Sequence, residues 1–293
     1  MIDIKLLTFI TVAKTNNFTR AANILNITQP AVSQHIKALE EYYNVKLFYK
    51  KGNGRQLTDE GKILFKYAVE LNRLSKVVES ELKNRTSVIS RYYVGATLTV
   101  GGYVIPNIIG KYRSMHESID IILYVENTES IMKRLFNGDI SLGIVEGPFN
   151  KTRVNYTKFK EDELVLAVSP NHPLARKCSV TLDELLREKL ILREKGSGTR
   201  KVFEEKLLEV GYSLEDIDVY MEIGNITALI SLVESNLGCT IISKEAIKQS
   251  LKENTLKIIP IDNFRILREF NFVYLNDTEL DFVDEFIRFC IKS

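Results

Sequence analysis

The sequence lacks long apolar runs, paired cysteines and a recognisable export signal. No run of about 18 apolar residues occurs, so no transmembrane helix and no membrane partner are predicted. The N-terminus, MIDIKLLTFI, has no charged region ahead of its apolar residues, and we therefore expect no signal peptide and a cytoplasmic protein. The three cysteines, Cys178, Cys239 and Cys290, lie far apart without CxxC spacing, which argues against a disulfide framework and a zinc site.

Motifs of common enzyme classes are also missing. The sequence contains no HExxH, no GxSxG and no GxxxxGK[ST], and its only histidines are His35, His116 and His172. A pair of carboxylates could always be found among 38 acidic residues, so none is informative. We therefore predict no catalytic residues, no metal ligands and no cofactor, and interpret the chain as a binding protein and not an enzyme.

Charge is distributed unevenly along a chain that is long enough for two or more domains. The 293 residues carry a net charge of only +2, but residues 1–57 hold eight cations against three carboxylates, a net +5. The remainder is therefore mildly acidic, at −3. A basic head on an acidic body predicts that the head alone binds nucleic acid.

The segment from Phe18 to Glu40, FTRAANILNITQPAVSQHIKALE, has the pattern of two short helices joined by a turn at Asn26-Ile27. Thr19 and Thr28 are the predicted helix caps, and Pro30 suits the first turn of the second helix. That helix has an apolar stripe expected to face inward, formed by Val32, Ile36, Leu39 and Tyr43. Its opposite face carries Pro30, Ser33, Gln34 and Lys37, whose amides, hydroxyl and cation suit base edges and phosphates. The alternative is an ordinary helical hairpin with a solvated outer face.

The flanking segments support a winged helix-turn-helix. Ile4–Lys14 is a predicted helix with Leu6, Phe9, Ile10 and Ala13 on one face. Residues 45–49 and 56–57 are predicted strands, and the KKGNGR stretch between them combines turn glycines with cations that could follow a phosphate backbone. A solvated hairpin loop is the alternative for that stretch.

Residues 1–65 resemble the N-terminal domain of LysR-type transcriptional regulators. The resemblance rests on Leu6–Phe9, on NNFTRAANILNITQPAVSQHIKALE and on VKLFYKKGNGRQLTDEG, in that family's order and spacing. It implies a double-stranded operator DNA partner. The residues expected to contact this DNA are Thr28, Gln29, Pro30, Ser33, Gln34, Lys37, Arg55 and Arg20.

A long helix is predicted to follow, capped by Thr58 and ended by the polar residues 84–90. Its apolar residues are spaced like a two-stranded coiled-coil seam: Leu64, Tyr67, Leu71, Leu74, Val78 and Leu82. We expect this seam to form a dimer, because a palindromic site requires a two-fold axis. Packing against its own wing domain is the alternative. The family resemblance implies a homodimer that pairs into a homotetramer.

From Arg91 onward predicted strands and helices alternate, which indicates an α/β fold with mainly parallel sheets. The break at Glu146-Gly147-Pro148 and a return segment around Ile258–Phe272 predict two half-domains crossed twice by the chain, as in solute-binding proteins. The predicted fold class is therefore α/β: an all-α winged helix-turn-helix head, a long linker helix, and two Rossmann-like subdomains of periplasmic-binding-protein type. The expected domains are residues 1–58, 59–89 and 90–293, with subdomain I at 90–161 plus 268–293 and subdomain II at 162–267.

Polar residues at strand ends predict a ligand cleft between these subdomains. They fall in GATLT at Gly95–Thr99, in Asn127-Thr128 and in GSGTR at Gly196–Arg200, where helices begin and free N–H groups suit a small oxyanion. Helix capping alone is the alternative for each. In the resembling family these positions line the effector pocket, and the predicted effector residues are Thr97, Thr99, Val100, Asn127, Thr128, Glu146, Ser197, Thr199 and Asn225, with Arg200 as a possible helper.

The sequence most resembles the branch of the family that regulates sulfur and cysteine metabolism. Thr97 and Thr99 match pocket threonines of that branch, whereas Val100 replaces a polar residue found in some members. The resulting interpretation is a transcriptional regulator that senses a small, anionic metabolite. The alternative is a small-molecule-binding protein or enzyme on a solute-binding fold with an accessory DNA-binding head.

Overall fold

The computed structural model describes residues 2–51, 54–87, 89–275 and 280–293. It divides into two compact units, one of Met1–Ser87 with Phe136–Asp139 and the other of Val88–Leu135 with Ile140–Ser293. Within the described ranges, no helix is both long and apolar enough to cross a membrane.

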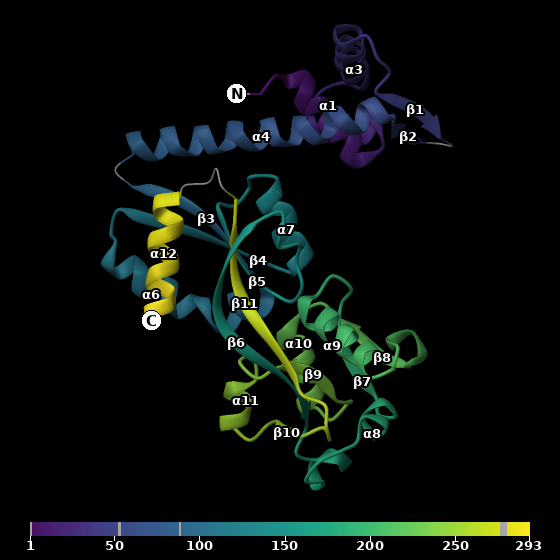
Figure 1. Ribbon diagram of the computed structural model, residues 1–293, viewed down its shortest axis with the longest axis vertical. Coiled ribbons are helices and arrows are strands. Elements are labelled where there is room, and N and C mark those ends of the chain that lie inside the picture. The colour runs from purple at the N-terminus through teal and green to yellow at the C-terminus, as the bar shows by residue number, and fades with distance from the viewer. Residues whose placement is uncertain (1, 52–53, 88, 276–279) are drawn as a thin grey trace. The chain divides into compact units, whose positions relative to one another are not determined.

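Three helices open the first unit (Figure 1): α1 (Ile4–Thr15), α2 (Phe18–Leu25) and α3 (Gln29–Tyr43). An asparagine with a left-handed backbone follows each of them, namely Asn16, Asn26 and Asn44, with φ of 51°, 53° and 53°. Asparagine tolerates this conformation better than most side chains, so each residue ends its helix and redirects the chain.

The start of α3 is as predicted, and the start of α2 is not. The Thr28 hydroxyl accepts a hydrogen bond from the Ala31 N–H at 3.3 Å and caps α3. For α2 the predicted cap, Thr19, is wrong, because it lies inside the first turn. Asn17 caps this helix, with its amide oxygen accepting from the Arg20 N–H at 2.9 Å. Asparagine is at least as good a cap as threonine, so the earlier residue starts the helix.

The core of the first unit is formed where α1, α2 and α3 meet. Its fully or nearly fully buried side chains include Phe9, Val12, Ala21 and Val32. The predicted inward stripe of α3 is confirmed for Val32, Ile36 and Leu39 and is wrong for Tyr43, which is 47% exposed. Tyr43 is the last residue of α3 and therefore lies beyond the reach of the core.

A short hairpin and a long helix complete this unit. Strands β1 (Phe48–Lys51) and β2 (Gly54–Leu57) pair antiparallel, and the predicted wing residues between them, 52–53, lie outside the described part of the chain. Thr58 caps α4 (Asp59–Thr86) as predicted, accepting from the Gly61 N–H at 2.9 Å. The helix continues two residues beyond Asn84, where its end was expected, because a polar sequence does not by itself stop a helix.

The second unit is built on one seven-stranded sheet. Its strands are β3 (Ser90–Thr97), β4 (Ile119–Glu126), β5 (Leu142–Glu146), β6 (Asn155–Val168), β9 (Thr240–Ser243), β10 (Lys257–Ile259) and β11 (Ile266–Tyr274). β3 is parallel to β4 and β5, whereas β11 is antiparallel to β5 and β6, and β6 is antiparallel to β9 and β10. The prediction of mainly parallel sheets is therefore wrong: the sheet is mixed, because β6 and β11 traverse it in opposite directions. A separate parallel pair consists of β7 (Leu190–Arg193) and β8 (Val219–Ile223).

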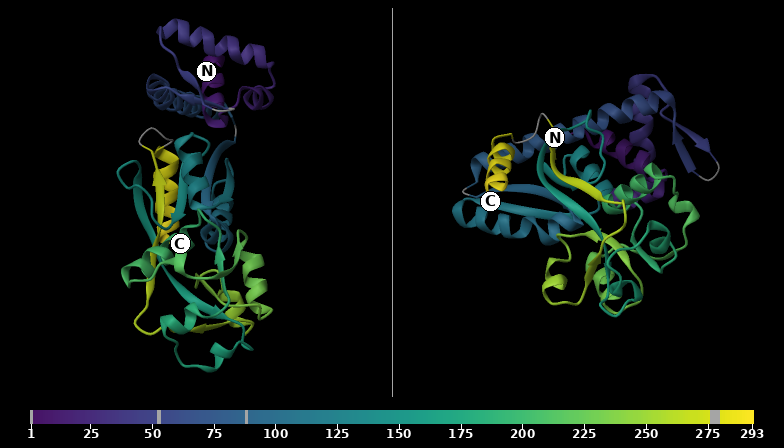
Figure 2. Two further views of the ribbon diagram at one scale, coloured as in Figure 1. Left: turned by 90° about the vertical axis from the view of Figure 1, so that its right-hand side faces the viewer. Right: turned by 60° about the horizontal axis from the view of Figure 1, so that its bottom comes forward.

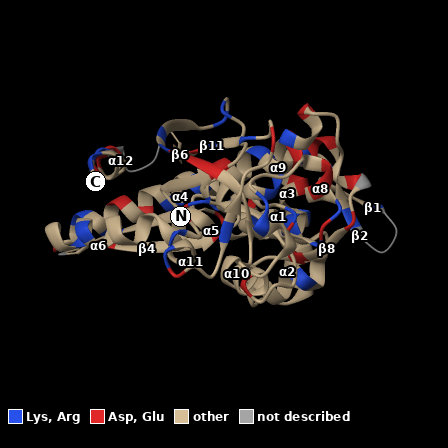
Figure 3. Cartoon of the chain, turned by 90° about the horizontal axis from the view of Figure 1, so that it is seen from below, with Lys and Arg blue, Asp and Glu red and all other residues tan. Residues whose placement is uncertain are grey.

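The helices of the second unit are α5 (Leu98–Tyr103), α6 (Ile105–Met115), α7 (Thr128–Phe136), α8 (Leu182–Leu186), α9 (Gly198–Glu209), α10 (Ile226–Glu234), α11 (Lys248–Lys252) and α12 (Leu280–Lys292). The single helix predicted from Val100 to Tyr112 is two helices, α5 and α6, and Pro106 lies in the first turn of the second. Acidic and basic residues are mixed along α9 and α12 (Figure 3), so neither helix presents a surface of one sign.

Two lobes with separate hydrophobic cores make up the second unit. Lobe I packs α5, α6 and α12 around residues such as Val94, Leu142 and Phe286. Lobe II has its own cores around Phe203 and Leu229. The strands β6 and β11 run through both lobes side by side (Figures 1 and 2). Two strands therefore join the lobes, as the predicted double crossing requires.

Candidate functional site

The outer face of α3 presents the side chains predicted to contact DNA. Thr28, Gln29, Pro30, Gln34 and Lys37 are exposed there, and Ser33 is half-buried. Gln29 Nε2 donates a hydrogen bond to Ser33 Oγ at 3.0 Å, which orients one of the two amides on this face. Exposed amides and a cation on one helical face can reach base edges and phosphates in a major groove.

A hydrogen bond that the sequence did not predict holds α3 on α1. The buried Thr8 hydroxyl donates to the Ile4 carbonyl oxygen at 2.8 Å, so it accepts from His35 Nδ1, which lies 2.9 Å away. This assigns the proton of a neutral His35 ring to Nδ1. His35 therefore positions α3 instead of sharing its exposed face.

The two arginines predicted to contact DNA lie near the start of α2. The Arg55 guanidinium stacks over the Phe18 ring, with Cζ 5.1 Å from the ring centroid, and its backbone N–H donates to the Asn16 carbonyl oxygen at 3.4 Å. Arg20 is exposed in the first turn of the same helix. Both cations thus remain accessible to phosphates.

In the second unit, four of the predicted effector residues come together at the junction of the lobes. Thr99 Oγ1 donates to Glu146 Oε1 at 2.9 Å, and Thr199 Oγ1 donates to the same oxygen at 3.5 Å. Thr128 Oγ1 donates to the Glu146 carbonyl oxygen at 2.9 Å. All four side chains are buried, and Thr199 comes from lobe II whereas the other three come from lobe I.

Arg268 on β11 completes this cluster, although the sequence did not single it out. Its Nη1 donates to Thr199 Oγ1 at 2.9 Å and its Nη2 to Thr99 Oγ1 at 3.5 Å. Its Nε donates to Asp162 Oδ2 on β6 at 2.7 Å, and Ser243 Oγ donates to the other oxygen of Asp162 at 2.9 Å. We call Thr99, Glu146, Asp162, Thr199 and Arg268 the junction cluster. It links both lobes through both crossing strands.

The backbone at this junction is tightly packed. A Cβ on Gly198, the first residue of α9, would overlap the Glu146 carbonyl oxygen and lie 2.6 Å from Thr128 Oγ1. Only glycine therefore allows lobe II to come this close to the end of β5. This contact closes the junction cluster on the side where α9 meets the end of β5.

The other predicted effector residues lie outside the junction cluster. Val100 packs in the core of lobe I, and the Thr97 hydroxyl donates to the Ile144 carbonyl oxygen at 3.5 Å. The remaining three cap helices: Asn127 accepts from Ser130 N–H, Ser197 from Arg200 N–H and Asn225 from Ala228 N–H. Helix capping, the alternative to ligand binding, therefore accounts for the hydrogen bonds of these three side chains.

Arg200, the possible helper, is committed to lobe II. Its Nε donates to Glu204 at 2.7 Å, and its Nη1 donates to the Arg193 carbonyl oxygen at 3.1 Å and to Glu222. Arg268 and not Arg200 therefore supplies the positive charge at the junction. The signal for this was present in ILREFNFVY, where Arg268 occupies an inward position between buried Ile266 and Phe270.

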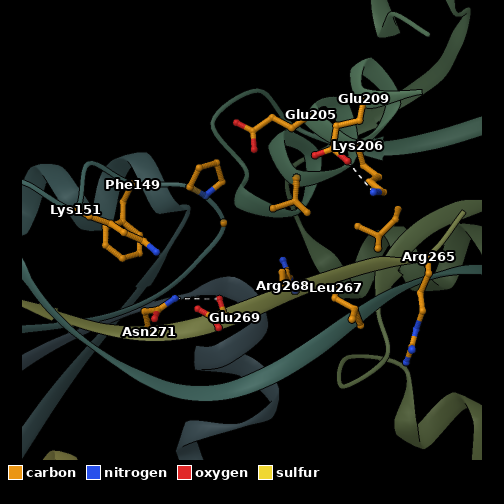
Figure 4. Close-up of a pocket in the computed structure, with 14 residues that line it drawn as sticks. Phe149, Lys151, Glu205, Lys206, Glu209, Arg265, Leu267, Arg268, Glu269 and Asn271 are labelled. Carbon is orange, nitrogen blue, oxygen red and sulfur yellow. Dashed lines mark hydrogen bonds and ion pairs between the residues drawn. The ribbon is translucent and has the colours of Figure 1, made fainter. Parts of the chain in front are cut away.

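A groove of about 570 Å³ lies beside the junction (Figure 4). Its walls are the Gly147–Phe149 loop with Lys151, one side of α9 from Val202 to Glu209, and β11 from Arg265 to Asn271. Figure 4 shows Leu267, Glu269 and Asn271 along β11 on this side. Strand alternation directs these three to the opposite face of the strand from Arg268. Arg268 also lines the groove, which therefore borders the junction cluster.

Two of the three cysteines are packing residues. Burial raises the pKa of the Cys239 thiol in lobe II and of the Cys290 thiol in lobe I to about 12 in each case. Both thiols therefore stay protonated at neutral pH, whereas Cys178 is exposed.

Comparisons with known proteins match both units. A family model described as "Bacterial regulatory helix-turn-helix protein, lysR family" matches residues 5–62, and one described as "LysR substrate binding domain" matches residues 88–293. An uncharacterized HTH-type transcriptional regulator of Methanocaldococcus jannaschii is 36% identical over 264 residues, covering 89% of this chain and 88% of the relative.

Solved structures show the same fold. The regulatory domain of CcmR from Synechocystis, in complex with 2-PG, matches with a TM-score of 0.60 and 27% identity, covering 68% of this chain and 96% of that domain. Full-length CbnR in complex with its target DNA matches with a TM-score of 0.63 and 16% identity, covering 100% of this chain and 99% of CbnR. These matches are to the family as a whole, and the resemblance to its sulfur and cysteine branch stays a prediction.

Proposed function

Because the chain belongs to the LysR family of transcriptional regulators, we propose that it binds operator DNA through α3 and adjusts that binding when a small molecule occupies the junction between lobe I and lobe II. The observation that carries this proposal is the junction cluster. Hydroxyls from both lobes converge there on one buried carboxylate and one buried guanidinium. Buried polar groups placed between two lobes are the usual setting for a ligand whose binding changes the angle between those lobes.

The DNA-contacting residues in this proposal are those of the exposed face of α3. The base edges are read by Gln29, Ser33 and Gln34, and Pro30 packs against these base edges. The phosphates or the minor groove are contacted by Thr28, Lys37, Arg20 and Arg55. The crystal structure of CbnR with its target DNA supports this role for a chain of the same fold. A protein that acts on operator DNA works in the cytoplasm.

The assembly and domain division are part of the same proposal. Residues 1–58 form the DNA-binding domain, 59–89 the dimerising linker helix and 90–293 the effector domain, with subdomains I (90–161, 268–293) and II (162–267). The exposed apolar residues along α4, including Leu71, Leu74 and Val78, support dimerisation through that helix. Two such dimers form the tetramer.

A coupling experiment tests the proposal. Operator affinity is measured with and without a library of small carboxylates, sulfur oxyanions, amines and free and acylated amino acids, for the wild type and for Thr199→Val. The substitution leaves Arg268 Nη1 without its hydroxyl partner, at a cost of about 1–3 kcal/mol. We expect the variant to bind operator normally in the absence of effector and to lose the effector's influence on that binding.

Thr240→Val is the matched control. Thr240 is equally buried in lobe II, but its hydroxyl has no hydrogen-bond partner within the described residues, so valine removes no interaction. An unchanged effector response in Thr199→Val, or a library in which no compound alters operator affinity, contradicts the proposed site.

A further inference from the structure

The junction cluster holds more negative than positive charge. Asp162 and Glu146 contribute two carboxylates, and Arg268 contributes one guanidinium. Their side chains are only 1–2% exposed. Water therefore cannot screen the second carboxylate, and burying a charge without a partner is costly.

The two carboxylates are not equally satisfied. Asp162 accepts from Arg268 Nε on one oxygen and from Ser243 on the other. Glu146 receives hydroxyl bonds on Oε1 only, and its Oε2 has no hydrogen-bond partner within the described part of the chain. The nearest cation, Arg268 Nη2, lies 3.5 Å from Oε2, near enough to attract but without a hydrogen bond. The missing partner at this junction is therefore a donor.

We propose that the effector carries a protonated amino group that binds Glu146 Oε2. This inference rests on the proposed function of the junction as the effector site and names the chemistry of the ligand. An ammonium group supplies both the missing hydrogen-bond donor and the charge that balances the second carboxylate. An effector that is only an anion, as the sequence predicted, would add a third negative charge beside Glu146 and Asp162.

The geometry links this contact to the motion of the lobes. Glu146 ends β5 in lobe I, and Gly198 of lobe II lies against its backbone. An amine can reach Oε2 only when the lobes separate, and it then remains beside Thr199 of lobe II when they close. The amine contact thus gives the ligand a different affinity for the open and closed arrangements, which is what an effector requires.

Matched compounds test the inference on the full-length protein. Calorimetry and operator binding are measured with the twenty proteinogenic L-amino acids, with the corresponding acids in which hydrogen replaces the amino group, and with the corresponding decarboxylated amines. We expect binding only among compounds with an amino group. Glu146→Gln should weaken that binding by roughly ten- to hundredfold, because it removes the charge and keeps the shape.

Two further variants distinguish a loss of amine binding from misfolding. Glu163→Gln is the control, because Glu163 is the residue after Asp162 on β6 but pairs with Arg265 and Lys244 outside the cluster. Glu146→Asp keeps the carboxylate and should retain the preference for amines at lower affinity, even if Glu146→Gln does not fold.

The outcomes separate this inference from the proposed function. If acids without an amino group bind, change operator affinity and depend on Thr199, the junction is the effector site and the amine inference is wrong. Equal binding of amines to wild type and Glu146→Gln also overturns it, because the proposed contact depends on the charge of the Glu146 carboxylate. If no compound binds in either experiment, both proposals fail.

Discussion

At the scale of single residues, Arg268 is a buried cation that connects several elements of the second unit. Its guanidinium contacts Asp162 on β6 and hydroxyls from both lobes, and its side chain is 2% exposed. A buried charge that loses its partner is strongly unfavourable, whereas an exposed ion pair contributes little. A nearby residue offers a direct comparison, because Arg265, one residue before β11, pairs with Glu163 at the surface and has a side chain that is 71% exposed.

Arg268→Met should therefore lower the free energy of unfolding of the second unit by about 3–5 kcal/mol, since it leaves Asp162 and Glu146 buried without a cation. Arg265→Met should change it by no more than about 1 kcal/mol. Denaturant titration of both variants gives the comparison. If the two variants lost similar amounts of unfolding free energy, the buried contacts of Arg268 would not stabilise the second unit more than the surface pair of Arg265 does.

On the DNA side, Gln34 is the residue with the clearest base-reading prediction. It is exposed on α3, beside the Gln29–Ser33 pair. Gln34→Ala should cost roughly 1–3 kcal/mol on the best operator and much less on random duplex, because an amide can pair with both acceptor and donor of an adenine. Lys37→Ala is the control and should weaken binding to both duplexes alike and reduce the salt dependence. If Gln34→Ala lost as much binding free energy on random DNA as on operator DNA, Gln34 would not read bases.

At the scale of elements, Glu40 joins α3 to the segment that leads into β1. Its carboxylate accepts from the Leu47 N–H at 2.9 Å and from Lys46 Nζ at 2.8 Å. Burial alone would raise the pKa of this carboxyl, but the hydrogen bonds from Lys46 and the Leu47 backbone outweigh it, and the pKa is lowered below its ordinary value. The ionised form is therefore the one that the folded state favours.

This lowered pKa sets the pH dependence of the contact. A carboxyl whose folded pKa is depressed stabilises the fold above its unfolded pKa, about 4.3, and loses that contribution as the pH falls through the folded pKa. Glu40→Gln should therefore cost about 1–3 kcal/mol at pH 7 and much less near pH 3, measured by denaturation of the first unit. Glu41→Gln is the control, because Glu41 is exposed and pairs with Lys37 only at 3.5 Å. If the difference in unfolding free energy between the Glu40 variant and the wild type did not change with pH, the lowered pKa of Glu40 would not be the cause of the stabilisation.

At the scale of the whole molecule, the apolar stripe of α4 is the feature that a monomer leaves unexplained. Leu71 is 54% exposed, and Tyr67, Leu74, Val78 and Leu82 are exposed along the same helix. Leu64, the first residue of the predicted seam, instead packs against the core of the first unit. The stripe beyond it is long enough to form a helical dimer contact.

Leu71→Glu should give smaller species in sedimentation velocity and weaker binding to a palindromic site, because it places a charge in a desolvated contact. The DNA-binding unit should stay folded, since Leu71 lies outside its core. Glu70→Gln changes a neighbouring charge off the seam and should leave the assembly intact. An unchanged oligomer in Leu71→Glu would place the dimer contact elsewhere on the chain.

The sequence by itself determined the elements whose causes are local. Thr28, Thr58 and the apolar spacing of α3 act within about four residues of one another, so caps and periodicity predicted these helices correctly. The prediction that the helix-turn-helix precedes the α/β part of the chain rested on local sequence patterns of the same kind. Where two local signals competed, as at Asn17 and Thr19, the prediction failed by two residues.

Tertiary structure alone decided the mixed sheet and the junction cluster. The strands β6 and β11 pair antiparallel because they cross between the lobes in opposite directions, and alternation within one strand carries no information on the direction of its partner. Arg268 meets Asp162 and Thr99 across 106 and 169 residues of chain. Glycine at position 198 and hydroxyls at strand ends are the sequence features on which the predicted site rests. Which carboxylate lacks a donor depended on how the folded lobes bring these distant groups together.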